Sequence, residues 1–191
     1  SGDAVLSGSS VVTQPEEVRR KIGFLTSELK LEDFFTPDYL YDFFSELYGI
    51  PIDRRDARKR MLFARFGIQE FAQVRVRDLS TGMKQKVSLV ISLVQDPEII
   101  IFDEPTNGLD ILTAKVVTDF LLDLKEQGKT IIVSTHIFSL VEKICDRVGI
   151  IINGRMAACE DLWTLCGDQS LEDRFFEIYE AVNGEEENHD K

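Results

Sequence analysis

The chain has 191 residues and a formal net charge of −12, and hydrophobic residues make up 43% of it. This length suits one domain, or one domain with a subdomain, and the apolar content is enough for a sizeable core. The negative charge argues against a nucleic-acid-binding protein, because phosphate backbones select basic surfaces.

Three features bear on where the protein works. No apolar run approaches the roughly 18 residues that a membrane-spanning helix needs, and the first residues show no signal-peptide pattern. The cysteines at 145, 159 and 166 have no CxxC spacing, so we interpret them as reduced thiols. We therefore expect a soluble, cytosolic protein.

The first 28 residues predict short elements. Glycines and serines between apolar residues in 1–14 fit a turn that joins two short strands, or else a flexible linker. The segment 15–20 predicts a helical turn with proline at its first position and acids after it. Ile22–Leu25 is typical of a strand.

Helical spacing dominates residues 36–67. Thr36 followed by proline predicts a helix start, and apolar residues follow at helical spacing as far as Gly49. Asp53 is predicted to cap a second helix that ends near Gly67. The first of these helices is rich in aromatic residues: Phe34, Phe35, Tyr39, Tyr41, Phe43, Phe44 and Tyr48. Basic residues crowd the second and the stretch after it, as a solvated helix face or a functional patch.

A capped helix and a buried strand follow. Ser80 is a good N-cap for an apolar helical segment that runs towards Pro97. Ile99–Phe102 is a continuous apolar run, as expected for a parallel strand buried on both faces. The carboxylates of Asp103 and Glu104 come directly after it. By itself this pair fits either a ligand site at a strand end or a solvated acidic pair.

The remainder alternates between helix and strand. Residues 111–127 predict an amphipathic helix that is stopped by Gly128, and Thr130–Ser134 predicts a strand with His136 just beyond it. Alone, His136 fits an ordinary histidine at a helix start. Further helices are predicted at 138–145, 160–167 and 171–182, and a hairpin of strands at 147–152 and 155–159. The acidic C-terminal residues are expected to form a frayed tail.

Three of these stretches together identify a family. Leu79–Gln85, Ile99–Glu104 and Pro105–Asp110 resemble the signature motif, the Walker B strand and the D-loop of ATP-binding subunits of ABC transporters, more narrowly those of ABC-2-type exporters. The resemblance implies an α/β fold of the P-loop NTPase (RecA-like) type. It has a parallel sheet flanked by helices and an inserted α-helical subdomain, with the N-terminal part of the fold missing here.

The resemblance also implies residue roles. Glu104 is the general base, and His136 is the switch residue that contacts the γ-phosphate and the attacking water. Asp103 holds Mg²⁺, usually through water. The nucleotide contacts carried over are Ser80, Thr81, Gly82, Met83 and Asp110. Ser27 stands where the family has a glutamine, and its shorter hydroxyl would bind the metal or a water on the metal.

Domains and partners follow from the same resemblance. Residues 1–28 would end in the Q-loop, 29–95 would form the α-helical signature subdomain, 96–160 the RecA-like core, and 161–191 the C-terminal helices. The implied partners are a membrane-spanning subunit and a second ATP-binding subunit in a head-to-tail dimer, with no nucleic acid. The implied cofactors are ATP and Mg²⁺, and the implied location is the cytoplasmic face of the membrane.

The sequence also lacks a motif that the family needs. It contains no G-x-x-x-x-G-K-[ST] P-loop, and Gly128–Lys129–Thr130 lies between a helix and a strand in the reverse order. We expect a fragment of a longer protein. A non-catalytic interaction subunit and a non-transport ABC ATPase remain alternatives. The strand that carries the P-loop would lie beside Thr130–Ser134, so we expect an open sheet edge there.

Overall fold

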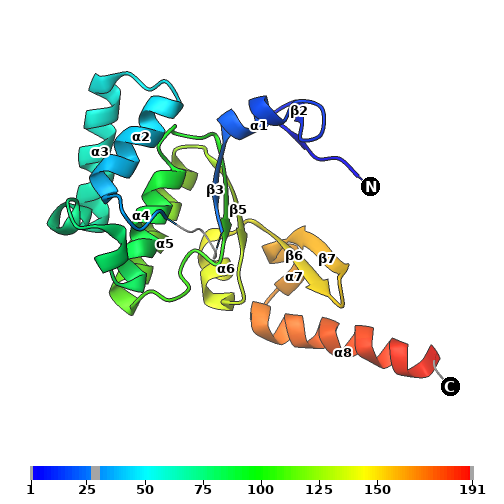
Figure 1. The fold of residues 1–191 in the computed structure, drawn as a ribbon. Helices are drawn as coiled ribbons and strands as arrows, with labels where there is room; N and C mark the ends of the chain where they lie inside the picture. The colour runs from blue at the N-terminus through cyan, green and yellow to red at the C-terminus, as the bar shows by residue number, and fades with distance from the viewer. Residues whose placement is uncertain (1, 27–30, 190–191) are drawn as a thin grey trace. The chain divides into compact units, whose positions relative to one another are not determined.

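The computed structural model describes residues 2–26 and 31–189, which form two compact units, Ser1–Ser134 and Thr135–Lys191. Each unit is described by itself below, and Figure 1 gives the element labels. No described helix is both long enough and apolar enough to cross a bilayer.

The first unit opens with the predicted pair of short strands. β1 (Val5–Leu6) and β2 (Ser9–Ser10) form an antiparallel hairpin. Helix α1 (Pro15–Lys21) begins with proline and leads directly into β3 (Ile22–Leu25), the strand predicted from the apolar run.

Helices fill the stretch between β3 and β4 (Ile99–Asp103). They are α2 (Pro37–Leu47), α3 (Ile52–Phe66), the 3₁₀ turns η1 (Ile68–Phe71) and η2 (Val76–Asp78), and α4 (Thr81–Ser92). Thr36 caps α2 by accepting a hydrogen bond from the Tyr39 amide at 3.2 Å, as predicted. The prediction that Asp53 caps α3 is wrong: the N-cap is Pro51 and makes no side-chain cap. Asp53 lies inside the first turn, where its charge still suits the helix dipole.

The sheet of the first unit has the predicted strand order. β4 (Ile99–Asp103) lies between β3 and β5 (Thr130–Ser134), and all three run parallel. Helix α5 (Ile111–Glu126) connects β4 to β5, and Figure 1 shows α4 and α5 on the same side of the sheet. The face towards these helices holds Leu25, Ile100 and Phe102, which are all buried.

The opposite face and the outer edge are open within the first unit. Phe24, Ile101 and Ile132 are in register across the three strands, and Phe24 and Ile132 are each about half exposed, at 53% and 52%. Among the described residues, β5 pairs with β4 and with no strand on its other side. The expected open edge is therefore present, and it is an apolar one.

The second unit packs a hairpin against a helix. Its elements are α6 (Phe138–Ile144), β6 (Arg147–Ile152), β7 (Arg155–Asp161), α7 (Leu162–Cys166) and α8 (Leu171–His189). Ile150, Ile152, Leu165 and Leu171 form its buried core. β7 is two residues longer than predicted, and α8 extends past residue 182. The expectation of a frayed tail is thus wrong as far as His189.

Candidate functional site

The start of α4 is built as the sequence predicts. The Ser80 backbone is extended, and its Oγ accepts a hydrogen bond from the Met83 amide at 3.3 Å. The first-turn amides of a helix have no acceptor within the helix, and they lie at the positive end of its dipole. The cap uses the Met83 amide, and the amides of Thr81 and Gly82 in the same turn present a donor-rich surface of the kind that binds phosphate.

The signature residues adjoin the D-loop. A β-carbon at Gly82 would lie 4.0 Å from the carbonyl oxygen of Gly108, and one at Gly108 would lie 4.0 Å from the Thr81 methyl group. These distances are ordinary van der Waals contacts, so packing within the chain leaves room for a side chain at Gly82. A glycine there has no side chain, so a ligand or another chain can approach the backbone closely.

The carboxylates lie at the end of β4, where the carboxyl ends of the strands meet. Asp103 is the last residue of β4 and is in register with Ser134 of β5. The Ser134 hydroxyl donates a hydrogen bond to Asp103 Oδ1 at 2.5 Å, and the Glu104 amide donates to the Ser134 carbonyl at 2.8 Å. Ser134 is a site residue that the motifs in the sequence do not predict. The signal available was a hydroxyl residue at the end of a strand next to the acidic pair.

Glu104 has a strained backbone. Its φ is +49°, in the left-handed region that a residue with a β-carbon rarely adopts. Such a conformation costs on the order of 1–3 kcal/mol and persists where the surroundings enforce it, most often at functional sites. Here both backbone groups of Glu104 are held. Its amide donates to β5, and its carbonyl accepts a hydrogen bond from the Asn107 amide at 3.1 Å, which closes a turn. The direction of the Glu104 side chain is thus set by the backbone.

Asp110 is a helix cap. Its carboxylate accepts hydrogen bonds from the Thr113 hydroxyl at 2.7 Å and from the Thr113 amide at 3.0 Å, and together they hold the pKa of Asp110 below its usual value. The D-loop is therefore fixed at one end by the strained Glu104 and at the other by the cap of α5. In between, the Thr106 hydroxyl is buried and has no hydrogen-bond partner among the described residues.

Two predicted residues cannot be placed beside these. His136 is exposed and belongs to the second unit, just before α6, where the Ile137 amide donates to the Thr135 hydroxyl at 3.2 Å. His136 is two residues after Ser134, whose carbonyl accepts the hydrogen bond from the Glu104 amide. Ser27 lies outside the described residues.

The donor set fits magnesium more than a softer metal. The described residues contain no group of three or more His, Cys, Asp or Glu side chains that could hold a metal ion. Mg²⁺ is usually bound through one or two carboxylates and completes its shell with water and phosphate oxygens. Asp103, oriented by Ser134, offers a carboxylate of this kind.

Comparisons with known proteins show the family. The family model for the ABC transporter matches residues 1–107. The ABC transporter ATP-binding protein NatA of Bacillus subtilis is 38% identical over 90% of this chain and 70% of its own length. A fluoroquinolones export ATP-binding protein of Mycobacterium tuberculosis is 36% identical over 62% of this chain and 38% of its own length.

A solved structure shows the same architecture. The ATP-binding subunit of an ABC transporter superposes with a TM-score of 0.85 at 27% identity, over 91% of this chain and 75% of that one. Besides NatA, the first curated relatives are longer, and this chain spans about half of their length. From its capped signature helix to its parallel sheet, the chain belongs to the ATP-binding proteins of the ABC transporter family.

Proposed function

We propose that this sequence supplies the signature, Walker B and D-loop part of an ATPase that powers transport across a membrane, in the direction of export. The observation that carries the proposal is the geometry at the carboxyl edge of the sheet. There, Asp103 is oriented by Ser134, and Glu104 is fixed in a strained turn. The export name of one relative supports the direction.

Glu104 is the proposed general base. Its carboxylate would take a proton from the water that attacks the terminal phosphate of ATP, which is general-base catalysis. Asp103 would hold Mg²⁺ through water, with Ser27 as a second oxygen ligand, and the bound ion would neutralise phosphate charge. His136 would contact the same phosphate and the attacking water.

The signature surface serves a second subunit. Ser80, Thr81 and Gly82 would donate to the phosphate of a nucleotide whose P-loop belongs to the partner, so that each site is shared across a two-fold interface. The room left at Gly82 supports this, because packing within the chain does not require a glycine there. Met83 and Asp110 would complete the nucleotide contacts.

An exposed row of rings, two on α2 and one just before it, supports a membrane partner. Phe35, Tyr39 and Phe43, here called the aromatic ladder, are stacked with ring centroids 4.6 and 6.3 Å apart. Each ring is 39–48% exposed. Exposed apolar clusters of this kind mark interaction sites.

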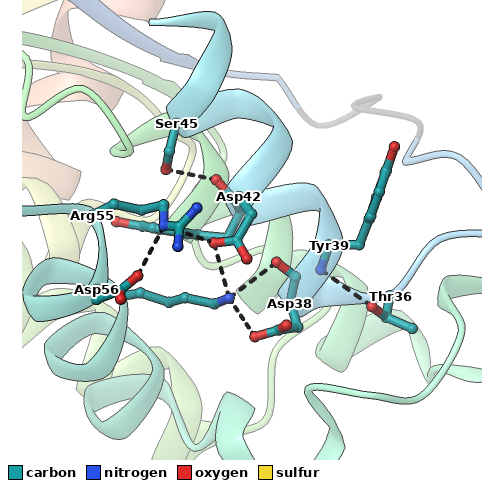
Figure 2. Close-up of polar contacts among 9 residues, drawn as sticks. Thr36, Asp38, Tyr39, Asp42, Ser45, Arg55 and Asp56 are labelled. Atoms are coloured by element: carbon teal, nitrogen blue, oxygen red, sulfur yellow. Dashed lines mark hydrogen bonds and ion pairs between the residues drawn. The ribbon is translucent and has the colours of Figure 1, made fainter. Parts of the chain in front are cut away.

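The ladder is kept on the surface by a polar network elsewhere on α2. Asp38 and Asp42 form ion pairs with Lys59 of α3, and Asp42 also pairs with Arg55 at 3.3 Å. Figure 2 shows Tyr39 pointing away from these carboxylates. The network joins α2 to α3, so the ladder is not needed for that contact. We propose that it lies beside the docking groove for the membrane-spanning subunit, on the cytoplasmic face of the membrane.

A cross-linking experiment tests the docking surface. A cysteine in place of Tyr39 should cross-link to cysteines in cytoplasmic segments of the membrane subunit, because the ladder would lie within reach of them. Lys115→Cys on the exposed surface of α5 is the matched control and should not. Cross-links from position 115 without any from position 39 would refute the assignment.

A binding experiment tests the nucleotide assignment. The 191-residue chain should bind MgATP negligibly, because it has no P-loop to cradle the phosphates. A P-loop-bearing form, meaning a polypeptide that carries this sequence after a P-loop segment, should bind it. Calorimetric titration of both measures the difference. Micromolar binding by the 191-residue chain would contradict the proposal.

A further inference from the structure

One carboxylate oxygen joins three elements of the first unit at the end remote from the candidate site. Asp96 Oδ1 lies 3.0 Å from Arg58 Nη2 of α3 and 2.9 Å from the ammonium group of Lys129, the residue before β5. Lys129 also donates to the Asp96 carbonyl at 3.2 Å. Asp96 itself lies in the loop between α4 and β4. We call these three residues the Asp96 node.

The cationic side of the node is partly buried. The side chains of Arg58 and Lys129 are only 20% and 17% exposed, whereas the side chain of Asp96 is 55% exposed. Partial burial works to raise the pKa of Asp96, but the hydrogen bond from Lys129 and the charge of Arg58 outweigh it and hold that pKa below its usual value. The carboxylate is therefore ionised at neutral pH and contacts two cationic side chains that are largely buried.

The same node holds the end of α4. Arg58 Nε donates to the carbonyl of Leu93 at 3.1 Å, and Leu93 is the C-cap of α4. The Asp96 amide donates to that carbonyl too, at 3.1 Å, with Asp96 in the left-handed region at φ +54°. One guanidinium thus binds both the end of the signature helix and the loop that leads into the Walker B strand.

The loop has little room to shift. Gln95 Nε2 donates to the Ile22 carbonyl at the start of β3, at 2.6 Å. A β-carbon at the next residue, Gly23, would lie 2.5 Å from the Ser92 carbonyl oxygen and 2.7 Å from Pro97 Cγ. The last turn of α4 and the loop therefore pack directly on the backbone of β3.

We propose that Asp96 is a positioning residue that sets the orientation of α4 on β4. The signature residues are at the end of α4 remote from this loop, and Asp103 is at the end of β4 remote from it. A change of angle at the loop would therefore move the signature residues relative to Asp103. The twelve residues of α4 span about 18 Å at about 1.5 Å each, so a tilt of about 10° would displace Ser80 by about 3 Å. The consequence for catalysis rests on the proposed function, whereas the orientation itself does not.

The test variant is Asp96→Asn. Asparagine has nearly the same size, keeps a carbonyl acceptor and tolerates positive φ, so the substitution removes the charge and leaves the loop conformation accessible. Arg58→Met removes the other charge and keeps the buried stem, and serves if Asp96→Asn fails to fold. Arg60→Met, an exposed position on the same helix, is the matched control.

The first measurement is a distance within the first unit. Spin labels are placed at the exposed Thr81, the first residue of α4, and at the exposed Leu112 of α5, in the 191-residue chain with its cysteines replaced by serine. The parent and Arg60→Met should give the same narrow distance distribution, and Asp96→Asn a broader or shifted one. An unchanged distribution in both Asp96→Asn and Arg58→Met would overturn the proposal.

The second measurement is ATP turnover by the P-loop-bearing form. Asp96→Asn should lower kcat by about tenfold with KM unchanged, because misplacement remote from the chemistry costs up to about 10²-fold. A shift in KM alone would overturn the catalytic part. If the parent form itself fails to hydrolyse ATP, the proposed function is wrong, and the distance measurement still decides the role of Asp96.

Discussion

Replacing Glu104 by glutamine in the P-loop-bearing form should reduce ATP turnover by about 10²–10⁴-fold, the usual contribution of a general base. The amide has the shape of the carboxylate but cannot accept the proton of the attacking water. ATP binding should persist, because glutamine keeps the size and polarity of the side chain and loses only the proton transfer that the reaction step needs. Steady-state hydrolysis and equilibrium binding of ATP, measured on the same preparation, separate the two effects.

The same chemical change at the other end of the strand is the control. Glu98 is exposed at the start of β4, away from the candidate site, and Glu98→Gln should leave turnover unchanged. His136→Ala should lower turnover as well, because His136 is the proposed contact of the terminal phosphate and the attacking water. Near-normal hydrolysis by both Glu104→Gln and His136→Ala would remove the assignment of this site.

A methyl group at Gly23 should be among the most damaging single additions to the first unit. It would meet the Ser92 carbonyl at 2.5 Å and Pro97 at 2.7 Å. Backbone and a proline ring cannot give way as a flexible side chain can, so α4 must move off β3. We expect Gly23→Ala to lower the free energy of unfolding by about 3 kcal/mol, at the upper end of overpacking costs. Urea unfolding should show a lower midpoint at an unchanged m-value.

Gly149 of β6 offers a matched alanine substitution. Its β-carbon would lie 3.3 Å from the Met156 sulfur, the movable end of a flexible side chain. Gly149→Ala should therefore cost less than about 1 kcal/mol, because such a chain can repack. Equal losses at positions 23 and 149 would show that the close approach of α4 to β3 is not what Gly23 serves.

The parts of the fold set by local pattern were predictable. The apolar runs of Ile22–Leu25 and Ile99–Phe102 and the β-branched run of Thr130–Ser134 predict strands to within a residue. Thr36 and Ser80 predict the starts of α2 and α4, because the cap is a local hydrogen bond. The order of the three strands came from the family resemblance, which spans long-range pairing that no local pattern encodes.

What depends on distant contacts was not predictable. The apolar segment after Ser80 continues to Val94 without a break in composition, yet α4 ends at Ser92, where Arg58 meets the Leu93 carbonyl. The left-handed conformation of Glu104 has no signal in its residue type, because it is enforced by pairing with β5. For Asp53 the pattern was misleading, since a proline one residue ahead of the helix already set its start.

The pairing of β3 with β4 also constrains how the first unit folds. Ile22 pairs with Ile99, and the chain between them contains α2, α3 and α4. Closing so long a loop while it is unstructured carries a large entropic penalty, and this penalty arises before the hydrogen bonds and contacts of the sheet can offset it. If those helices form first, the last turn of α4 packs on Gly23, and this contact places the beginning of β4 next to β3. The helices then act as the nucleus and the sheet as the late step, and substitutions at the α4–β3 contact should slow refolding more than they speed unfolding.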